Sequence, residues 1–376
     1  MNILRYFPEG LAKGEAFINR KEERRSLIDR IKSNKHTVLI APRRYGKTSL
    51  VAKVAEEMEM PYCSIDLLAA FSEEYVRDQI IDKVSRLVFD ILPSVNKAKE
   101  KVINIFKKMR PEISIGAFGQ RLTFTLTSNP LKDITELLLK LDETAQYFDK
   151  EAVIFIDEFQ QISKLKNYHS IEASIRYAVE RSEKIAYVFS GSNRSLLEQM
   201  FGDQGRPLYR LCQTIQIDRI AKEEYIDLWQ QLAKIKWGKL LTIEAMEHIL
   251  SNTELHPFYV NVLCQILWTE KEIPATEIID AAWHDYVKTQ RNIIGHDIME
   301  LSLNQRKVII ALAKNPTKEV QSTEFISPLK ISASSVQQAV EVLLKKDLIY
   351  QAKDAFYRIL DPAMKYYLNI ILWSDR

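Results

Sequence analysis

Residues 40–50 read IAPRRYGKTSL, and this short stretch decides the fold of the 376-residue chain. A mostly β-branched run at residues 37–40 precedes it, and residues 47–60 (KTSLVAKVAEEMEM) follow with helical periodicity. A strand, a loop and a helix in this order, with Gly-Lys-Thr where the helix begins, are typical of a phosphate-binding loop. In such a loop the backbone N–H groups and the positive end of the helix surround the phosphates. The sequence therefore predicts a nucleotide site at this loop.

Three residues of the loop carry most of its chemistry. The Lys47 ammonium reaches the β- and γ-phosphate oxygens, the Thr48 hydroxyl binds Mg²⁺, and Gly46 lets the backbone approach the phosphates closely. Ala41 stands where such loops usually begin with glycine. That glycine mainly eases the turn out of the strand, so Ala41 followed by Pro42 can be accommodated. A chance Gly-Lys-Thr at a helix start is the alternative. The residues expected to contact the nucleotide are Ala41, Pro42, Arg43, Arg44, Tyr45, Gly46, Lys47, Thr48 and Ser49.

A second apolar run, residues 152–159 (AVIFIDEF), ends in two acids. A P-loop ATPase needs a carboxylate at the tip of a neighbouring strand to position Mg²⁺, and Asp157 fits that task. Glu158, the next residue, is the candidate that polarises the attacking water. A strand that ends in solvated acids is the alternative, and the pairing with Lys47 favours the catalytic interpretation.

Polar and cationic candidates follow further along the chain. In residues 190–195 (SGSNRS), Asn193 is the first candidate to hold the water or sense the γ-phosphate, with Ser190 and Ser192 behind it. An ordinary polar turn is nearly as good an interpretation. Arg206 and Arg210 are candidates to neutralise transition-state charge, in the same chain or on a neighbouring subunit of a homo-oligomer. A solvated surface arginine is the favoured alternative for both.

Apolar runs and helical patterns alternate along the first 220 residues, which predicts an α/β domain with a parallel sheet covered on both faces. Alternating residues around Gly116 and Gly119 predict a β-hairpin inserted at about 107–129. Residues 221–295 are entirely helical in pattern and are expected to form a separate domain. The expected domain limits are 1–220, 221–295 and 296–376.

The last segment has three short helical patterns (303–314, about 321–327 and 332–346), followed by two strand signals at 348–351 and 355–359. This is the outline of a winged helix. The helix near 332–346 offers Ser334, Ser335, Gln337 and Gln338 to a DNA groove, and Lys345, Lys346, Lys353 and Arg358 to phosphates. Many winged helices bind proteins instead, so the expected partner of this segment is DNA or a protein.

Composition limits the class of protein. The hydrophobic fraction is 46% and the formal net charge is +3, which excludes a strongly basic nucleic-acid coat. Three widely spaced cysteines argue against a disulfide framework, and no Cys-x-x-Cys or His-Glu-x-x-His motif indicates a zinc site. No secretory signal and no apolar run long enough to cross a bilayer is seen. We therefore expect a cytoplasmic protein without a membrane partner.

Taken together, the sequence resembles the archaeal-type ATPases of the AAA+/STAND branch of P-loop NTPases, which also occur in bacteria. The resemblance rests on PRRYGKTSL (42–50) and IDEFQ (156–160), and on FINRKEERRSL (17–27), which looks like the family's F-x-x-R-x-x-E box. HPFYVNVLCQIL (256–267) and YRILDPAMKYYL (357–368) also look like family segments. Leu255 replaces the glycine of the family's G-x-P motif, and Arg210-Leu211 replaces its Gly-Arg.

The resemblance implies a sheet order of 5-1-4-3-2, a helical lid domain and a C-terminal winged helix. By carry-over, Phe17, Ile18, Asn19 and Arg20 flank the adenine, while His256 and Pro257 sense the state of the nucleotide. The expected cofactors are ATP or ADP with Mg²⁺, and the expected activity is a slow or partner-stimulated ATPase that acts as a conformational switch. Two alternatives are a DNA-acting ATPase and a nucleotide-stabilised interaction scaffold with negligible turnover.

Overall fold

The computed structural model describes residues 3–18, 20–93, 96–116, 119–352 and 354–372. It divides the chain into two compact units, each described by itself below. The nucleotide unit is Arg20–Ile217, and the C-terminal unit combines Met1–Asn19 with Asp218–Arg376. The three-domain limits expected from the sequence stay a prediction.

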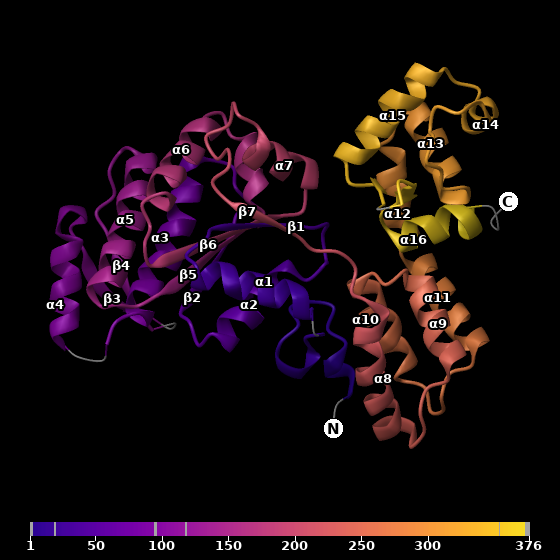
Figure 1. Ribbon diagram of the computed structural model, residues 1–376, viewed down its shortest axis with the longest axis horizontal. Coiled ribbons are helices and arrows are strands. Elements are labelled where there is room, and N and C mark those ends of the chain that lie inside the picture. The colour runs from indigo at the N-terminus through magenta and orange to yellow at the C-terminus, as the bar shows by residue number, and fades with distance from the viewer. Residues whose placement is uncertain (1–2, 19, 94–95, 117–118, 353, 373–376) are drawn as a thin grey trace. The chain divides into compact units, whose positions relative to one another are not determined.

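A five-stranded parallel sheet forms the centre of the nucleotide unit (Figure 1). Its strands are β1 (Thr37–Ile40), β2 (Tyr62–Asp66), β5 (Ala152–Asp157), β6 (Ile185–Gly191) and β7 (Gln213–Gln216). The spatial order is β2-β5-β6-β1-β7, which confirms the predicted order 5-1-4-3-2 when the sheet strands are counted along the chain. Ile40 pairs with Gly191, so the loop after β1 begins beside the end of β6.

Helices cover both faces of this sheet (Figure 1). One face carries α1 (Lys21–Lys32) and α2 (Lys47–Glu57), and the other carries α3 (Glu73–Asp90), α5 (Pro130–Tyr147), α6 (Tyr168–Val179) and α7 (Arg194–Gly202). Successive strand residues point to opposite faces. Val38 and Ile40 therefore join the core under α3, α5 and α6, while Leu39, fully buried, points to the opposite face.

The predicted hairpin is present in the same unit. Strands β3 (Glu112–Gly116) and β4 (Gly119–Thr123) pair antiparallel, with Ile113 opposite Leu122. The hairpin is shorter than predicted, because a 3-10 helix occupies Lys107–Met109. Helix α4 (Asn96–Ile105) precedes it, and a second 3-10 helix at Phe159–Lys164 follows the two acids of β5.

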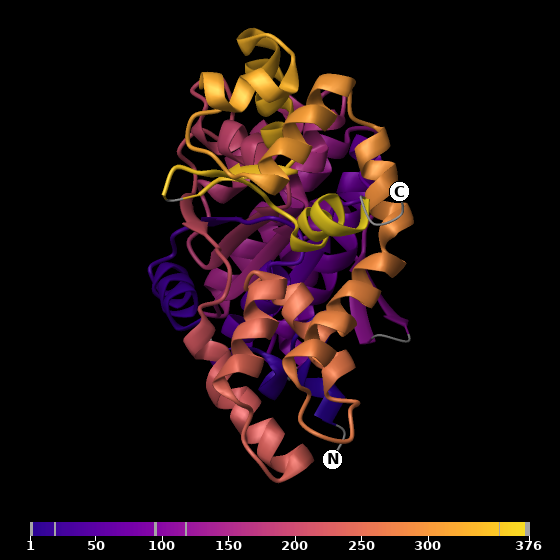
Figure 2. The same ribbon diagram turned by 90° about the vertical axis from the view of Figure 1, so that its right-hand side faces the viewer.

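The C-terminal unit has one continuous core that includes Trp229, Trp268 and Trp283. Its elements are α8 (Lys222–Trp237), α9 (Ile243–Thr253), α10 (Pro257–Leu267), α11 (Thr276–Thr289), α12 (Arg291–Met299), α13 (Leu303–Lys314), α14 (Thr323–Ile326), α15 (Ala333–Lys345), β8 (Ile349–Gln351), β9 (Tyr357–Ile359) and α16 (Pro362–Tyr366), with short helices at Ile3–Tyr6, Gly14–Ala16, Ser327–Leu329 and Tyr367–Ile371. Strands β8 and β9 form the antiparallel wing, drawn in yellow in Figure 2, and confirm the predicted winged helix.

The first residues of the chain pack on the helices of this unit. The Asn261 amide donates to the carbonyl of Pro8 (2.7 Å) and the Gln265 amide to the carbonyl of Phe7 (2.5 Å), both from α10. The Phe7 ring also lies 4.8 Å from that of Trp268. Among the described residues, no helix is long and apolar enough to cross a membrane.

Candidate nucleotide-binding site

The backbone of the loop explains its glycine. Gly46 has φ 80° and directly precedes α2, so the chain turns from loop to helix through a left-handed conformation that glycine adopts most easily. A Cβ at Gly46 would meet no protein atom within 4 Å. Within the chain itself, the need for glycine is therefore conformational and not steric. Arg44, at φ 64°, shares the left-handed geometry, whereas Ala41 does not.

The structure shows why alanine can stand at position 41, where such loops usually begin with glycine. Its side chain is fully buried and its backbone needs no positive φ, so a methyl group is tolerated where related loops carry glycine. Lys47 is also buried, at 6% exposure, and its ammonium donates to the carbonyls of Ala41 (3.1 Å) and Pro42 (3.0 Å). The ammonium is thus held inside the loop, next to the first turn of α2.

Thr48 and Asp157 come together as the sequence predicts. The Thr48 hydroxyl donates to Asp157 Oδ2 over 2.8 Å, although 109 residues separate the two in the chain. The other carboxylate oxygen of Asp157 accepts the N–H of Glu158 (2.9 Å) and the hydroxyl of Ser190. A hydroxyl and a carboxylate are oxygen ligands of the kind that Mg²⁺ prefers, so the donor set fits this metal.

Glu158 sits at a bend with φ 51°, directly after β5. Its Oε2 accepts hydrogen bonds from the Ser192 hydroxyl (2.8 Å) and from the Gln160 amide (2.6 Å). Ser192 in turn accepts from Arg43 Nε of the loop (3.2 Å). A hydrogen-bonded chain therefore runs from the phosphate loop to Glu158, and its contacts to the carboxylate come from neutral groups.

Gln160 and Gly191 are functional candidates that the sequence analysis missed. Gln160 is buried, and a Cβ at Gly191 would lie 1.8 Å from Gln160 Oε1. Only glycine at the end of β6 therefore leaves room for the amide that bonds Glu158. A lone glycine at the end of an apolar strand run was the available signal, because such a glycine often marks a close approach.

Asn193 caps the helix that follows β6. Its Oδ1 accepts the N–H of Leu196 (2.9 Å), which makes it the N-cap of α7. The serines ranked behind it, Ser190 and Ser192, are the residues that contact Asp157 and Glu158. The predicted sensing role of Asn193 stays a prediction.

Arg20 contacts the loop from the N-terminal side. Its side chain is 3% exposed, and it donates to the carbonyl of Tyr45 (2.9 Å) while pairing with Glu23 (3.0 Å). The other residues expected around the nucleotide base or in its sensing motif are not part of the nucleotide unit. Phe17, Ile18, His256 and Pro257 belong to the C-terminal unit, and Asn19 lies outside the described residues. Their nucleotide contacts stay predictions.

The two candidate arginines differ in environment. Arg206 is buried and pairs with Glu172, and it also donates to the Ser163 hydroxyl (2.9 Å). Burial raises the pKa of Glu172, an effect that Arg206 opposes. Arg206 therefore stabilises the interior of the unit. Arg210 is exposed, with φ 55° and its guanidinium 5.0 Å from the Tyr209 ring, and its catalytic role stays a prediction.

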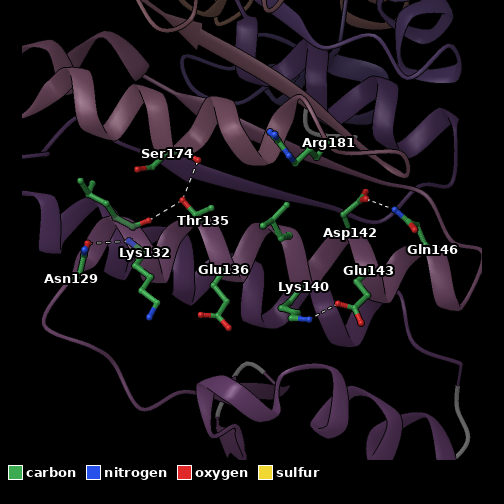
Figure 3. Close-up of a pocket in the computed structure, with 12 residues that line it drawn as sticks. Asn129, Lys132, Thr135, Glu136, Lys140, Asp142, Glu143, Gln146, Ser174 and Arg181 are labelled. Atoms are coloured by element: carbon green, nitrogen blue, oxygen red, sulfur yellow. Dashed lines mark hydrogen bonds and ion pairs between the residues drawn. The ribbon is translucent and has the colours of Figure 1, made fainter.

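Another groove in the same unit is lined by none of these residues (Figure 3). It has a volume of about 720 Å³ along α5, and its lining carries three cations and three acids. Its polar groups pair locally: Lys140 with Glu143 (2.5 Å), and Gln146 with Asp142 (2.7 Å). The balanced charge gives this groove no preference for a charged ligand.

Comparison with family models agrees with this geometry. Residues 17–261 match the model of an ATPase domain found predominantly in Archaea, and residues 296–370 match a probable winged helix domain. A comparison with curated protein sequences gave no match.

Solved structures show the same fold. A Walker-type ATPase of Pyrococcus abyssi superimposes with a TM-score of 0.70 at 18% identity, covering 97% of this chain and 100% of the other. The ADP form of the ORC2 protein of Aeropyrum pernix gives a TM-score of 0.52 at 12% identity, covering 99% and 98%. At these identities the likeness concerns the fold.

Proposed function

Because the chain belongs to the family of ATPase domains found predominantly in Archaea, we propose that this P-loop ATPase binds ATP with Mg²⁺, hydrolyses it to ADP and phosphate, and acts as a nucleotide-dependent switch. One observation carries the proposal. Thr48 and Asp157 form a 2.8 Å hydrogen bond beside an ammonium, Lys47, that is buried within the loop. Such a set of one cation, one hydroxyl and one carboxylate suits a metal-bound triphosphate.

Thr48 and Asp157 are the residues that would hold Mg²⁺. When bound, the ion would supply positive charge that neutralises the negative charge developing on the phosphate oxygens during transfer. Ser190 supports this arrangement, since its hydroxyl bonds Asp157 and keeps that carboxylate turned toward Thr48.

The loop would bind the phosphate tail through its amides and Lys47. Lys47 Nζ now bonds the carbonyls of Ala41 and Pro42, so phosphate oxygens would take the place of these weaker neutral acceptors. Arg20 would hold the loop in shape, because its guanidinium fixes the carbonyl of Tyr45 just before Gly46.

Glu158 would orient the water that attacks the γ-phosphorus and accept its proton as the bond to the β-phosphate oxygen breaks. Both side-chain contacts of the carboxylate within the described residues go to Oε2, from Ser192 and Gln160. These contacts fix the carboxylate plane and leave Oε1 to meet the water.

The test of nucleotide binding is a thermal-unfolding series with Mg²⁺ and ATP, ADP or GTP. At a ligand concentration of a hundred times Kd, the wild type should gain about 2.7 kcal/mol of stability. Lys47→Ala should lose this gain, whereas Lys53→Ala, a change at an exposed pair in the same helix, should keep it. An unchanged gain in Lys47→Ala would refute the proposed site.

The switch requires that ATP and ADP favour different states of the chain. The chain passes between its two units at residues 19–20 and 217–218, and the predicted base-flanking residues Phe17 and Ile18 adjoin the first of these. We expect different small-angle scattering profiles for the ATP and ADP states of a Glu158→Gln variant, which holds ATP without turnover. Identical profiles would contradict the switch while leaving nucleotide binding intact.

A further inference from the structure

We propose that the C-terminal unit holds a second phosphate-binding site, in a cavity of about 440 Å³ between the helices α8 and α9 and the wing β8–β9. Four cationic side chains line it, Arg219, Lys222, Arg358 and Lys365, against a single carboxylate, Glu254. This imbalance sets it apart from the α5 groove, where cations and acids are equal in number. The inference does not depend on the function proposed for the loop.

Two of the cations are already committed to Glu254. The Glu254 carboxylate accepts from Arg219 Nη1 (2.9 Å) and from Lys365 Nζ (2.5 Å). Burial by itself would raise the pKa of Glu254, but the contacts with Lys365 and Arg219 outweigh it and lower that pKa. Arg219 also donates to the carbonyl of Leu360 (3.1 Å), so it serves to hold the walls of the cavity together.

The other two cations are available to a ligand. Lys222 is exposed at the start of α8, and no ion pair or hydrogen bond holds its ammonium within the part of the chain that the structure describes. Arg358 pairs with Asp354 (2.5 Å), but both side chains are more than a third exposed. An exposed pair of this kind contributes little stability, so Arg358 can exchange its partner at small cost.

The geometry of the wing directs Arg358 into the cavity. Tyr350 and Arg358 are directly paired across β8 and β9, so their side chains share one face of the wing. The guanidinium of Arg219 lies 5.7 Å from the centre of the Tyr350 ring and closes that side. The Arg358 guanidinium and the Lys222 ammonium line the same cavity as the Lys365 ammonium. Together these cations match the oxygens of a phosphate group.

The ligand chemistry is therefore a phosphate monoester or diester, supplied by a free nucleotide or by a nucleic-acid backbone. Lys222 and Arg358 are the residues to change, because removing Arg219 or Lys365 would take away one of the two cations that pair with the Glu254 carboxylate. The matched control is Lys234→Ala with Lys236→Ala, which removes the same charge from the opposite end of α8.

The test uses full-length chains that also carry Lys47→Ala, titrated with inorganic pyrophosphate in a calorimeter. Any remaining binding at the loop contributes equally to every variant. Relative to the Lys47→Ala chain, Lys222→Ala with Arg358→Ala should raise the dissociation constant about tenfold or more, as two charge-assisted contacts are lost. The control pair should leave it nearly unchanged. Equal effects of the two pairs, or no pyrophosphate binding by the Lys47→Ala chain, would overturn the proposal.

A second arm identifies the source of the phosphate. Binding of a labelled DNA duplex is followed at several salt concentrations for the same chains. If the cavity binds a backbone phosphate, Lys222→Ala with Arg358→Ala should reduce the slope of log binding constant against log salt concentration by about two, because two phosphate contacts disappear. If the pyrophosphate effect is present and the DNA slope is unchanged, the ligand is a free phosphate compound.

Discussion

Glu158 and Glu254 occupy almost the same backbone conformation in the two units, yet the chain surrounds them differently. Both have positive φ, 51° and 48°, a left-handed conformation that is unfavourable for a residue with a side chain. Glu158 accepts hydrogen bonds from neutral groups, Ser192 and Gln160. Glu254 is held by two cations. The Glu158 carboxylate therefore has neutral hydrogen-bond donors as its partners, whereas the Glu254 carboxylate is paired with opposite charge.

The difference shows what each bend achieves. At Glu158 the bend follows β5 and places the carboxylate in contact with Ser192, which accepts a hydrogen bond from Arg43 of the phosphate loop. At Glu254 the bend continues into Leu255, with φ 61°, and ends directly before the predicted sensing residues His256 and Pro257. We infer that the proposed catalytic carboxylate, Glu158, differs from the ion-paired Glu254 in the charge of its partners.

The largest expected effect comes from Glu158→Gln. If the uncompensated carboxylate orients and deprotonates water, phosphate release should fall about a hundredfold or more, with ATP affinity retained. Glu56→Gln, at an exposed acid on α2, is the control and should release phosphate at the wild-type rate. Equal release by wild type and Glu158→Gln would remove Glu158 from catalysis, and negligible release by both would favour the interaction scaffold.

Glu254→Gln should act on stability and not on chemistry. It leaves two cations, Arg219 and Lys365, without their shared carboxylate, so the free energy of unfolding should fall by about 2 kcal/mol. Urea denaturation measures this, and the variant should release phosphate within a small factor of the wild type. A variant as stable as the wild type would show that the ion pairs contribute nothing.

Gly191→Ala tests the packing behind Glu158. The added methyl group would meet Gln160 Oε1, so we expect a loss of about 1–3 kcal/mol and a displaced Gln160 amide. Gln160→Ala in the same chain should recover most of the stability but little of the phosphate release. Additive losses in the double variant would contradict the contact.

The smallest effect is a pH dependence. The folded pKa of Glu254 is lowered by Lys365 and Arg219 in spite of burial. Its contribution is therefore present above the unfolded pKa of about 4.3 and is lost as the pH falls through the lower folded value. The stability difference between wild type and Glu254→Gln should be constant near neutrality and shrink below about pH 4. A stability difference between the two chains that grows as the pH falls would contradict the lowered pKa of Glu254.

Local patterns and the family resemblance predicted much of this molecule. The loop, the acids of β5, the hairpin and the winged helix all have signatures that lie within short windows. The sheet order came from the resemblance, because strand neighbours far apart in sequence leave no mark in composition. The cap formed by Asn193 was open to local reasoning, since asparagine is a favoured N-cap, but its place after a strand suggested a catalytic role instead.

Contacts between distant side chains were not accessible in this way. Two examples are the contact of Gln160 with Gly191 and the hydrogen bond from Arg20 to the carbonyl of Tyr45. Both depend on how packed elements approach one another. The packing of residues 3–18 on the C-terminal unit depends on the contact between Phe7 and Trp268, which no sequence periodicity predicts. Such contacts follow from the assembled core and carry no local signal.

Both points where the chain leaves the nucleotide unit are attached to the phosphate loop or to the strand that leads into it. Arg20, directly after the first crossing, bonds the carbonyl of Tyr45, and Ile217, directly before the second, donates its N–H to the carbonyl of Ile40 (3.0 Å). Tension on either connecting segment is therefore delivered to the residues that border the loop. A pull applied to the C-terminal unit by a bound partner would reach the phosphate loop through the Arg20 side chain at the first crossing and through the backbone hydrogen bond of Ile217 at the second.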